Sequence, residues 1–360
     1  AAAIETPGGL KVQTIHSFSE RLLQRFPLEA GVPPGFTILD DMTARSLLRE
    51  AIDETLTRAT REPASPLGRA LKLAVSYAAD DSFDEVLANA LARRDWIEHV
   101  VRRVPEDERD DRDPFDDIEP AYRTAFGLGA DATAGSIDEA RASIVSDAVA
   151  RYGAETLRSG GKTDQRLGEF LAAAAITDEP AQRIAAYTGA FLIKEGNARS
   201  DRQFITKAIR EREPGLADAL VSARDTFARL TRDRRAIGVI DATLALMRLA
   251  DAVLTEYATL KARRAALDFD DLIRRAANLL GTSGAAEWVL YKLDGGLDHI
   301  LVDESQDTSP EQWRIVSALA GEFFSGAGNH PTQPTLFAVG DEKQSIYSFQ
   351  GARPEQFARM

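Results

Sequence analysis

Short apolar segments that could form buried strands lie only near the two ends of this chain, which limits the folds open to it. Residues 10–15 are one candidate strand, and residues 299–302 and 336–339 are two more. Between about residues 40 and 280 the apolar residues recur at helical spacing without a period-2 strand pattern. Continuously apolar strands that alternate with helices are typical of a buried parallel sheet. The pattern predicts one parallel sheet built from both ends, with about 250 residues of helices inserted.

Helix-start signals follow two of the candidate strands. Ser17 and Glu20 form a Ser-x-x-Glu pattern, which predicts a capping box that opens a helix. A second helix start is predicted at residues 308–311, with Pro310 in its first turn. In open α/β sheets, ligands bind beyond the carboxyl ends of the strands. We therefore expect a site made of the polar residues that follow the three strands, namely Thr14, His16, Asp303, Glu304, Asp341 and Gln344.

Composition excludes several classes of protein. The 44% content of hydrophobic residues is that of a globular chain. The lack of cysteine excludes a disulfide scaffold, a thiolate metal site and a cysteine nucleophile, and it fits a reducing cytosol. No run of about 18 apolar residues is present, and the N-terminal residues do not resemble a secretory signal. We expect a cytoplasmic protein without a membrane partner.

The acidic residues are concentrated in one segment. The chain has 44 basic and 57 acidic residues, a net charge of −13, which argues against a basic nucleic-acid coat protein. Residues 106–120 hold nine acids and two bases, so this run alone carries −7. It favours a solvated loop or linker over an acidic DNA mimic or partner tail. By contrast, residues 221–264 carry nine bases and five acids, so the acidic total does not forbid a local nucleic-acid groove.

The strongest chemical signal is the carboxylate pair Asp303 and Glu304 at the end of an apolar segment. Two adjacent carboxylates there are costly unless a cation or a solvated ligand meets them. A nucleoside triphosphatase needs one carboxylate near Mg²⁺ and a second that orients and deprotonates the attacking water. Asp303 suits the first role and Glu304 the second. A pair of surface acids at the start of a loop would give the same tetrapeptide, so the pair alone leaves both interpretations open.

Four segments together resemble one family. The string Asp-Glu-Ser-Gln-Asp-Thr at 303–308 resembles the Walker B segment of superfamily 1 helicases of the UvrD/Rep type, and residues 338–352 resemble the motif that follows it. Residues 14–18 resemble the family's Thr-x-His DNA-contact motif, and residues 268–272 its Asp-Phe-x-x-Leu segment. The four motifs occur in family order. Within the family the wording looks most like AddA, the helicase–nuclease subunit of the AddAB double-strand-break repair complex.

The resemblance implies an α/β fold that is mostly helical by residue count. It would be a partial RecA-like P-loop NTPase core with a parallel sheet and a large all-α insertion. The implied domains are residues 1–26 and 266–360 of the motor domain, and a helical insertion at 27–265 with an acidic loop near 105–120. No segment matches a P-loop: residues 160–163 end in Gly-Lys-Thr, but Thr156 stands where the first glycine is needed. We interpret them as a loop between helices.

The resemblance also implies a role for each site residue. Asp303 would hold Mg²⁺ through water, Glu304 would act on the attacking water, and Gln344 would sense the γ-phosphate of ATP. With Gln306, which would couple this site to the DNA groove, these residues form the expected ATP site. Thr14 and His16 would contact DNA, and Tyr347 and Phe349 would stack on bases of a single strand. Phe269 is a further DNA candidate. Core packing is the alternative for the three aromatic residues, and a structural role for His16.

The implied function is ATP-driven translocation along DNA and unwinding at a duplex junction, with 3′ to 5′ polarity, in recombinational repair beside an AddB-like partner subunit. Without a P-loop or the arginine fingers of a second motor domain, we expect the chain to be a fragment that is inactive alone. The main alternative is a catalytically inactive, helicase-like DNA-binding scaffold. Two others are a different P-loop ATPase with a helical insertion, and a metal-dependent nuclease that uses Asp303, Glu304 and Asp341.

Overall fold

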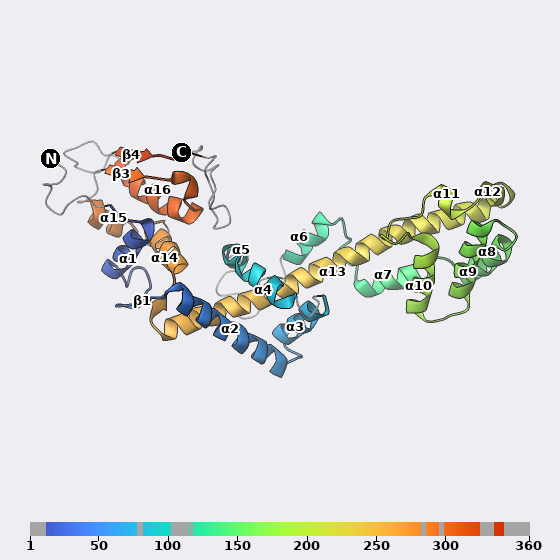
Figure 1. Cartoon of the computed structure of the whole chain (residues 1–360), viewed down its shortest axis with the longest axis horizontal. Coiled ribbons are helices and arrows are strands. Elements are labelled where there is room, and N and C mark those ends of the chain that lie inside the picture. Colours follow the sequence, from blue (N-terminus) through green and yellow to red (C-terminus); the bar gives the residue numbers. More distant parts are fainter. Residues whose placement is uncertain are drawn as a thin grey trace. The chain divides into compact units, whose positions relative to one another are not determined.

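The computed structural model describes residues 12–77, 82–101, 115, 118–281, 286–294, 299–324 and 335–341 (Figure 1). The chain divides into two compact units. Unit 1 comprises Ala1–Glu54 and Thr255–Met360, and unit 2 comprises Thr55–Leu254. Helices α2 (Asp41–Arg61) and α13 (Pro214–Arg263) each contribute residues to both units. The domain boundaries expected from the sequence, at 26/27 and 265/266, remain predictions.

Unit 2 is helical wherever the structure describes it, apart from one isolated bridge between Leu192 and Ala198. Its core packs α8, α9, α10 and α13 around Tyr187, Phe191 and Phe227, all completely buried. The Tyr187 and Phe191 rings stack with centroids 5.6 Å apart, and the Tyr187 hydroxyl donates to the carbonyl of Val145 at 3.2 Å. Besides parts of α2 and α13, the helices are α3 (Pro66–Tyr77), α4 (Phe83–Leu91), α5 (Arg94–Val101), α6 (Ile118–Ala125), α7 (Ala134–Ala142), α8 (Asp147–Leu157), α9 (Lys162–Ala175), α10 (Pro180–Phe191), α11 (Asp201–Phe204) and α12 (Lys207–Arg212).

Unit 1 holds all the strands that the structure describes. Its core packs α14 against α1, α15 and α16, with Leu23, Ala276 and Ile315 almost fully buried. In chain order its elements are α1 (Ile15–Arg25), β1 (Thr37–Ile38), β2 (Ala266–Leu267), α14 (Phe269–Gly281), α15 (Ala286–Asp294), β3 (His299–Val302), a short 3-10 helix (Ser305–Asp307), α16 (Pro310–Phe324) and β4 (Thr335–Ala338). No helix in the described ranges is long and apolar enough to cross a membrane.

The strands form two parallel pairs. β3 pairs with β4 in a register that runs from His299 opposite Thr335 to Val302 opposite Ala338. β1 pairs with β2, with Thr37 opposite Ala266. The two C-terminal strands therefore occur where the sequence predicts them, with β4 beginning one residue earlier, and their pairing is parallel as expected. The mostly helical character of the chain is confirmed, whereas the assignment to a RecA-like core remains a prediction.

The N-terminal strand prediction is wrong in the part that the structure describes. Residues 12–14 have no strand partner, and Ile15 already begins α1. Thr14 caps this helix, because its Oγ accepts a hydrogen bond from the backbone N–H of Ser17 at 3.1 Å. The predicted Ser17–Glu20 capping box is therefore also wrong, since both residues lie inside the helix. The capping hydroxyl stabilises a helix start that overrides the β propensity of Val12, Thr14 and Ile15.

Three smaller expectations also fail. β2 lies inside the stretch expected to lack strands, but its two residues are too few to show a period. The β3–β4 pair is buried on only one face, where Ile300, Val302 and Leu336 pack with Trp313, whereas Leu301 and Phe337 are 70% and 62% exposed. In the expected acidic loop, residues 118–120 begin α6. The second helix start is confirmed, since Ser309 and Gln312 cap α16 reciprocally.

Candidate functional site

The carboxylate pair lies at the carboxyl end of β3, as the sequence predicts. Asp303 and Glu304 directly follow buried Val302, and both side chains are exposed. Glu304 has φ 50° and ψ 45°, a left-handed conformation that non-glycine residues rarely adopt. Its backbone N–H donates to Asp303 Oδ1 at 3.0 Å, which stabilises the sharp turn. The turn thus ends the strand abruptly and holds two carboxylates side by side in solvent.

Gln306 links this turn to the neighbouring strand. The side chain is 2% exposed; its Nε2 donates to Glu304 Oε2 at 2.6 Å, and its Oε1 accepts from the N–H of Asp341 at 3.0 Å. Backbone bonds extend the strand pairing, from Ser305 N to Val339 O and from Val339 N to Val302 O, both at 2.9 Å. A buried amide therefore positions the Glu304 carboxylate against the end of β4. This contact gives Gln306 a structural basis for its expected place in the site.

Gly340 makes the close approach of the two segments possible, and the sequence analysis missed it. A Cβ atom at this position would lie 2.3 Å from Ser305 Oγ and 2.6 Å from Gln306 Oε1. Only glycine lets the end of β4 pass this close to the 3-10 helix. The Gly-Asp pair directly after an apolar strand was the signal that could have identified it.

The carboxylates suit Mg²⁺ and a nucleotide in their chemistry. Mg²⁺ is usually bound by one or two carboxylates together with water and substrate phosphate oxygens. Asp303 and Glu304 provide such oxygens at a solvent-accessible strand end. Within the described ranges, no group of three His, Asp or Glu residues could enclose a metal ion without a further ligand. The pair therefore fits a metal that arrives with a phosphate. Gln344, Tyr347 and Phe349 lie outside the residues that the structure describes.

Three of the expected DNA contacts meet on one surface of unit 1. The His16 ring in α1 meets the Phe269 ring edge-on, with centroids 5.8 Å apart and an interplanar angle of 85°. Phe269 is 45% exposed, so core packing does not explain it, and Thr14 is also exposed. Burial lowers the pKa of His16 below its usual 6.5, which keeps the ring neutral at pH 7. Motifs about 250 residues apart in sequence are thus brought together.

A buried ionic cluster holds Phe269 in place. Asp268 and Asp271 cap the start of α14 reciprocally, with N–H to carboxylate distances of 2.8 and 3.1 Å. Lys261 Nζ donates to Asp268 Oδ2 at 2.9 Å and also to Asp271, and the Tyr257 hydroxyl donates to Asp268 at 3.1 Å. The sequence analysis missed this cluster, although the Asp-x-x-Asp spacing at a helix start signals the capping part.

Comparison with known families identifies the chain. The family model described as "UvrD/REP helicase N-terminal domain" matches residues 4–360. A match over this length shows the family, and the chain belongs to it. The resemblance seen in the motifs is therefore confirmed.

Relatives with assigned names share a limited segment with this chain. It is 35% identical over 105 residues to the "RecBCD enzyme subunit RecB" of Mycolicibacterium smegmatis, a match that covers 29% of this chain and 9% of that protein. It is 38% identical over 104 residues to an ATP-dependent helicase/nuclease subunit of Desulfitobacterium hafniense, covering 29% and 7%. It is 38% identical over 89 residues to the "ATP-dependent DNA helicase Rep" of Escherichia coli, covering 25% and 11%. The chain thus matches only a small part of each relative's length.

Proposed function

We propose that this chain is part of an ATP-dependent DNA helicase, and that unit 1 contributes to a RecA-like motor core. The observation that carries the proposal is the Asp303–Glu304 pair at the end of a parallel strand, joined through Gln306 to the end of the adjacent strand. This arrangement could transmit a change at the carboxylates to the segment after β4. Membership of the UvrD/REP family and the helicase names of the relatives support the same function.

In this proposal Asp303 holds Mg²⁺ through water and Glu304 accepts a proton from the attacking water. Mg²⁺ bound with ATP would neutralise charge on the phosphates. The hydrogen bond from Gln306 at 2.6 Å orients the Glu304 carboxylate. Gln344, which follows β4, is proposed to sense the γ-phosphate. An amide suits this role because it donates and accepts hydrogen bonds without changing charge.

The DNA-binding surface is proposed to consist of Thr14, His16 and Phe269, with Tyr347 and Phe349 stacking on bases of the single strand. The exposed Phe269 ring offers a platform that any base can use, as a motor that moves along DNA requires. Translocation from 3′ to 5′, recombinational repair, a cytoplasmic location and an AddB-like partner are further parts of the proposal. The relatives named as RecB and as a helicase/nuclease support these parts.

The DNA surface can be tested by anisotropy with a labelled single-stranded oligonucleotide. Loss of one stacking ring weakens binding by about 1–3 kcal/mol, so Phe269→Ala should raise the Kd roughly tenfold. Phe126→Ala is the matched control, because Phe126 is a phenylalanine of similar exposure, 48%, in unit 2. Circular dichroism would verify that both variants fold. Equal affinities for the two variants would refute the assignment of Phe269.

The catalytic proposal has two tests. The 360-residue chain should show no DNA-stimulated phosphate release, since no segment of it matches a P-loop. In a longer chain that carries the P-loop, Glu304→Gln should lower kcat by about 10²–10⁴-fold, because the general base is lost while nucleotide binding remains. Glu287→Gln, at an exposed position of α15, serves as the control. If that longer chain has no activity to lose, the DNA-binding scaffold is the better description.

A further inference from the structure

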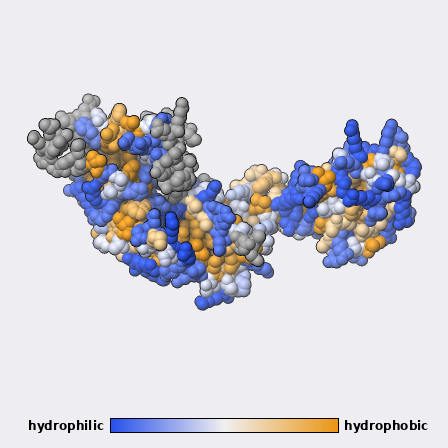
Figure 2. All heavy atoms as spheres, in the orientation of Figure 1, coloured by the Kyte–Doolittle hydropathy of each residue, from blue (hydrophilic) through white to orange (hydrophobic). Residues whose placement is uncertain are grey.

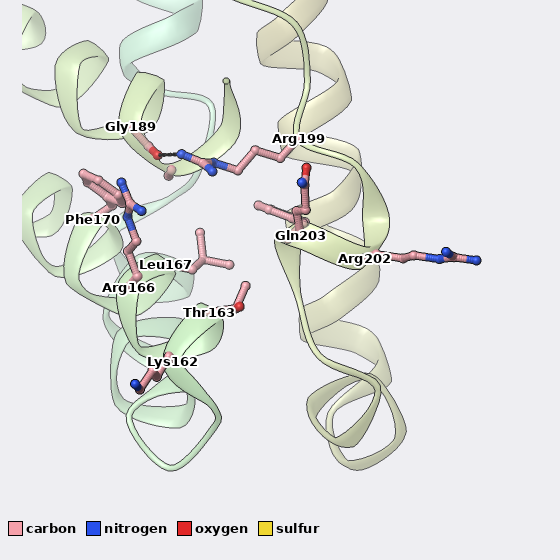
Figure 3. A pocket seen from close by; sticks show the side chains of 11 residues that line it. Lys162, Thr163, Arg166, Leu167, Phe170, Gly189, Arg199, Arg202 and Gln203 are labelled. Atoms are coloured by element: carbon pink, nitrogen blue, oxygen red, sulfur yellow. Dashed lines mark hydrogen bonds between the residues drawn. The ribbon is translucent and has the colours of Figure 1, made fainter. Parts of the chain in front are cut away.

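Unit 2 contains a pocket of about 330 Å³ that the helicase motifs do not involve. It lies between the first half of α9, α10 and the segment from Arg199 to Phe204 (Figure 3). Buried Leu167, Ala190 and Phe204 contribute its apolar lining. Lys162 and Thr163, from the Gly-Lys-Thr segment that is not a P-loop, also line it. The surrounding lobe, formed by α8 to α12, is mainly hydrophilic on the face shown in Figure 2.

The charge of this pocket is unbalanced. Its lining contains four cations, Lys162, Arg166, Arg199 and Arg202, and no acidic residue. None of the four forms an ion pair with any residue for which the structure gives a position. Asp164, an acid in the first turn of α9, is completely buried and accepts hydrogen bonds from the Gly161 N–H and from both the N–H and hydroxyl of Thr206. It is therefore committed to joining α9 to the start of α12.

The fold places Arg199 firmly in the pocket. Its N–H donates to Phe191 O and its carbonyl accepts from Arg224 Nη1, both at 2.8 Å. Its guanidinium donates to Gly189 O at 3.0 Å, the bond drawn in Figure 3. That bond uses one of the five N–H donors of the group. The guanidinium thus has a fixed position and spare donors, which lowers the entropy lost when a ligand binds.

Arg166 is positioned by an aromatic ring. Its guanidinium lies 5.9 Å from the centroid of Phe170, and Figure 3 shows the two side chains next to each other. Phe170 in turn packs so close to α10 that a Cβ atom at Gly189 would lie 2.4 Å from its ring. Burial and the nearby charge of Arg166 both lower the pKa of Arg199 below its usual value. The two guanidinium groups therefore lie close enough to repel each other, and an anion bound between them would relieve that repulsion.

We propose that this pocket binds a phosphate group, presented by the backbone of single-stranded nucleic acid. Arginine forks match the oxygens of phosphate in bidentate geometry, and the Thr163 hydroxyl and Lys162 ammonium add donors at the rim. The volume is that of a small-ligand site, so one nucleotide unit fits. A free phosphate compound shares this chemistry, and the experiment distinguishes the two sources. The pocket lies in unit 2, so the inference is independent of the DNA surface proposed in unit 1.

The test uses the absence of cysteine in this chain. Gln203→Cys, at an exposed position of the pocket lining, gives a single attachment point for an environment-sensitive fluorophore. The labelled 360-residue protein is titrated with a twelve-residue oligothymidylate, with ATP and with pyrophosphate. The same titrations are repeated with Arg166→Gln/Arg199→Gln and with Lys162→Gln. Arg151→Gln on α8 is the matched control, since Arg151 is exposed and outside the pocket lining.

We expect a saturable signal with the oligothymidylate that the double variant weakens roughly tenfold to a hundredfold, because hydrogen bonds to a charged group are lost. Its dependence on salt should also decrease, by about 0.7 in the slope of log K against log salt for one phosphate contact on a single strand. Lys162→Gln, which loses an exposed charge and no protein contact, should weaken binding in the same direction, and Arg151→Gln should leave it unchanged.

A signal with ATP and pyrophosphate alone would support the phosphate pocket and assign a free phosphate compound as its ligand. No signal with any of the three probes would overturn the proposal. So would equal affinities of the Lys162→Gln variant and the unsubstituted protein, a comparison that stays valid even if the double variant does not fold.

Discussion

At the scale of single residues, Gly340 sets the distance between the two halves of the proposed nucleotide site. Gly340→Ala should lower the free energy of unfolding by about 1–3 kcal/mol, because its Cβ would overlap Ser305 Oγ and Gln306 Oε1. Gly321→Ala in α16 is the control, since nothing lies within 4 Å of its Cβ and alanine favours a helix by about 0.5–1 kcal/mol. Urea unfolding would measure both. Stabilisation by Gly340→Ala would contradict the close approach.

Asp241 in α13 carries a charge that the fold disfavours. Burial and the nearby charge of Glu119 raise its pKa above 3.8, although Arg123 and Arg234 oppose the effect. A carboxyl group with a raised pKa is most stabilising when protonated, and this contribution is lost as the pH rises through the pKa of the folded state. Asp241→Asn should therefore stabilise the protein at pH 7, by no more than about 0.5 kcal/mol because solvent screens the charge.

The gain from Asp241→Asn should disappear as the pH falls below 3.8, where the native side chain is neutral as well. Unfolding curves at pH 7 and at acidic pH measure the difference. Asp218→Asn, at an exposed position of the same helix, should have little effect at either pH. A loss of stability on Asp241→Asn at pH 7 would show that the attraction to the two arginines dominates.

At the scale of elements, the sequence indicated helices and long strands well but not the shortest pairings. Residues 299–302 are continuously apolar, so β3 could be located to the residue. The two-residue strands β1 and β2 depend on a pairing between positions 37 and 266, which no local pattern can reveal. The failed strand at residues 10–15 shows the opposite case, in which one capping hydroxyl on Thr14 decided the local structure. Likewise, the carboxylates were visible as a motif, but the bridge through Gln306 requires contact across 35 residues.

The junction between α13 and α14 depends on Lys261, whose side chain is 7% exposed beside Asp268 and Asp271. Lys261→Met should lower the free energy of unfolding by about 3–5 kcal/mol, because two buried carboxylates lose their cation. Arg264→Met, three residues on, breaks the exposed pair with Glu50 and should lower it by less than about 1 kcal/mol. Guanidinium unfolding compares the two variants. Similar losses would mean that the buried cluster contributes no more than a surface pair.

At the scale of the whole molecule, the order of the motifs predicted that segments from both ends build one unit around a helical insertion. The division of the chain into Ala1–Glu54 with Thr255–Met360, and Thr55–Leu254, agrees with that idea in outline. The exact boundaries could not be read from the sequence. Helices α2 and α13 continue through positions 54 and 254 without a proline, so no local break marks the change of unit.

Because each unit has its own core, we expect the chain to unfold in two thermal transitions. The core of unit 2 contains Leu171 and that of unit 1 contains Leu23, both completely buried. Substitution of a buried leucine by alanine destabilises a core by about 2–5 kcal/mol. In differential scanning calorimetry, Leu171→Ala should therefore lower the midpoint of one transition, and Leu23→Ala that of the other. A single transition lowered by both substitutions would show instead that α2 and α13, which contribute residues to both units, couple the two cores into one cooperative fold.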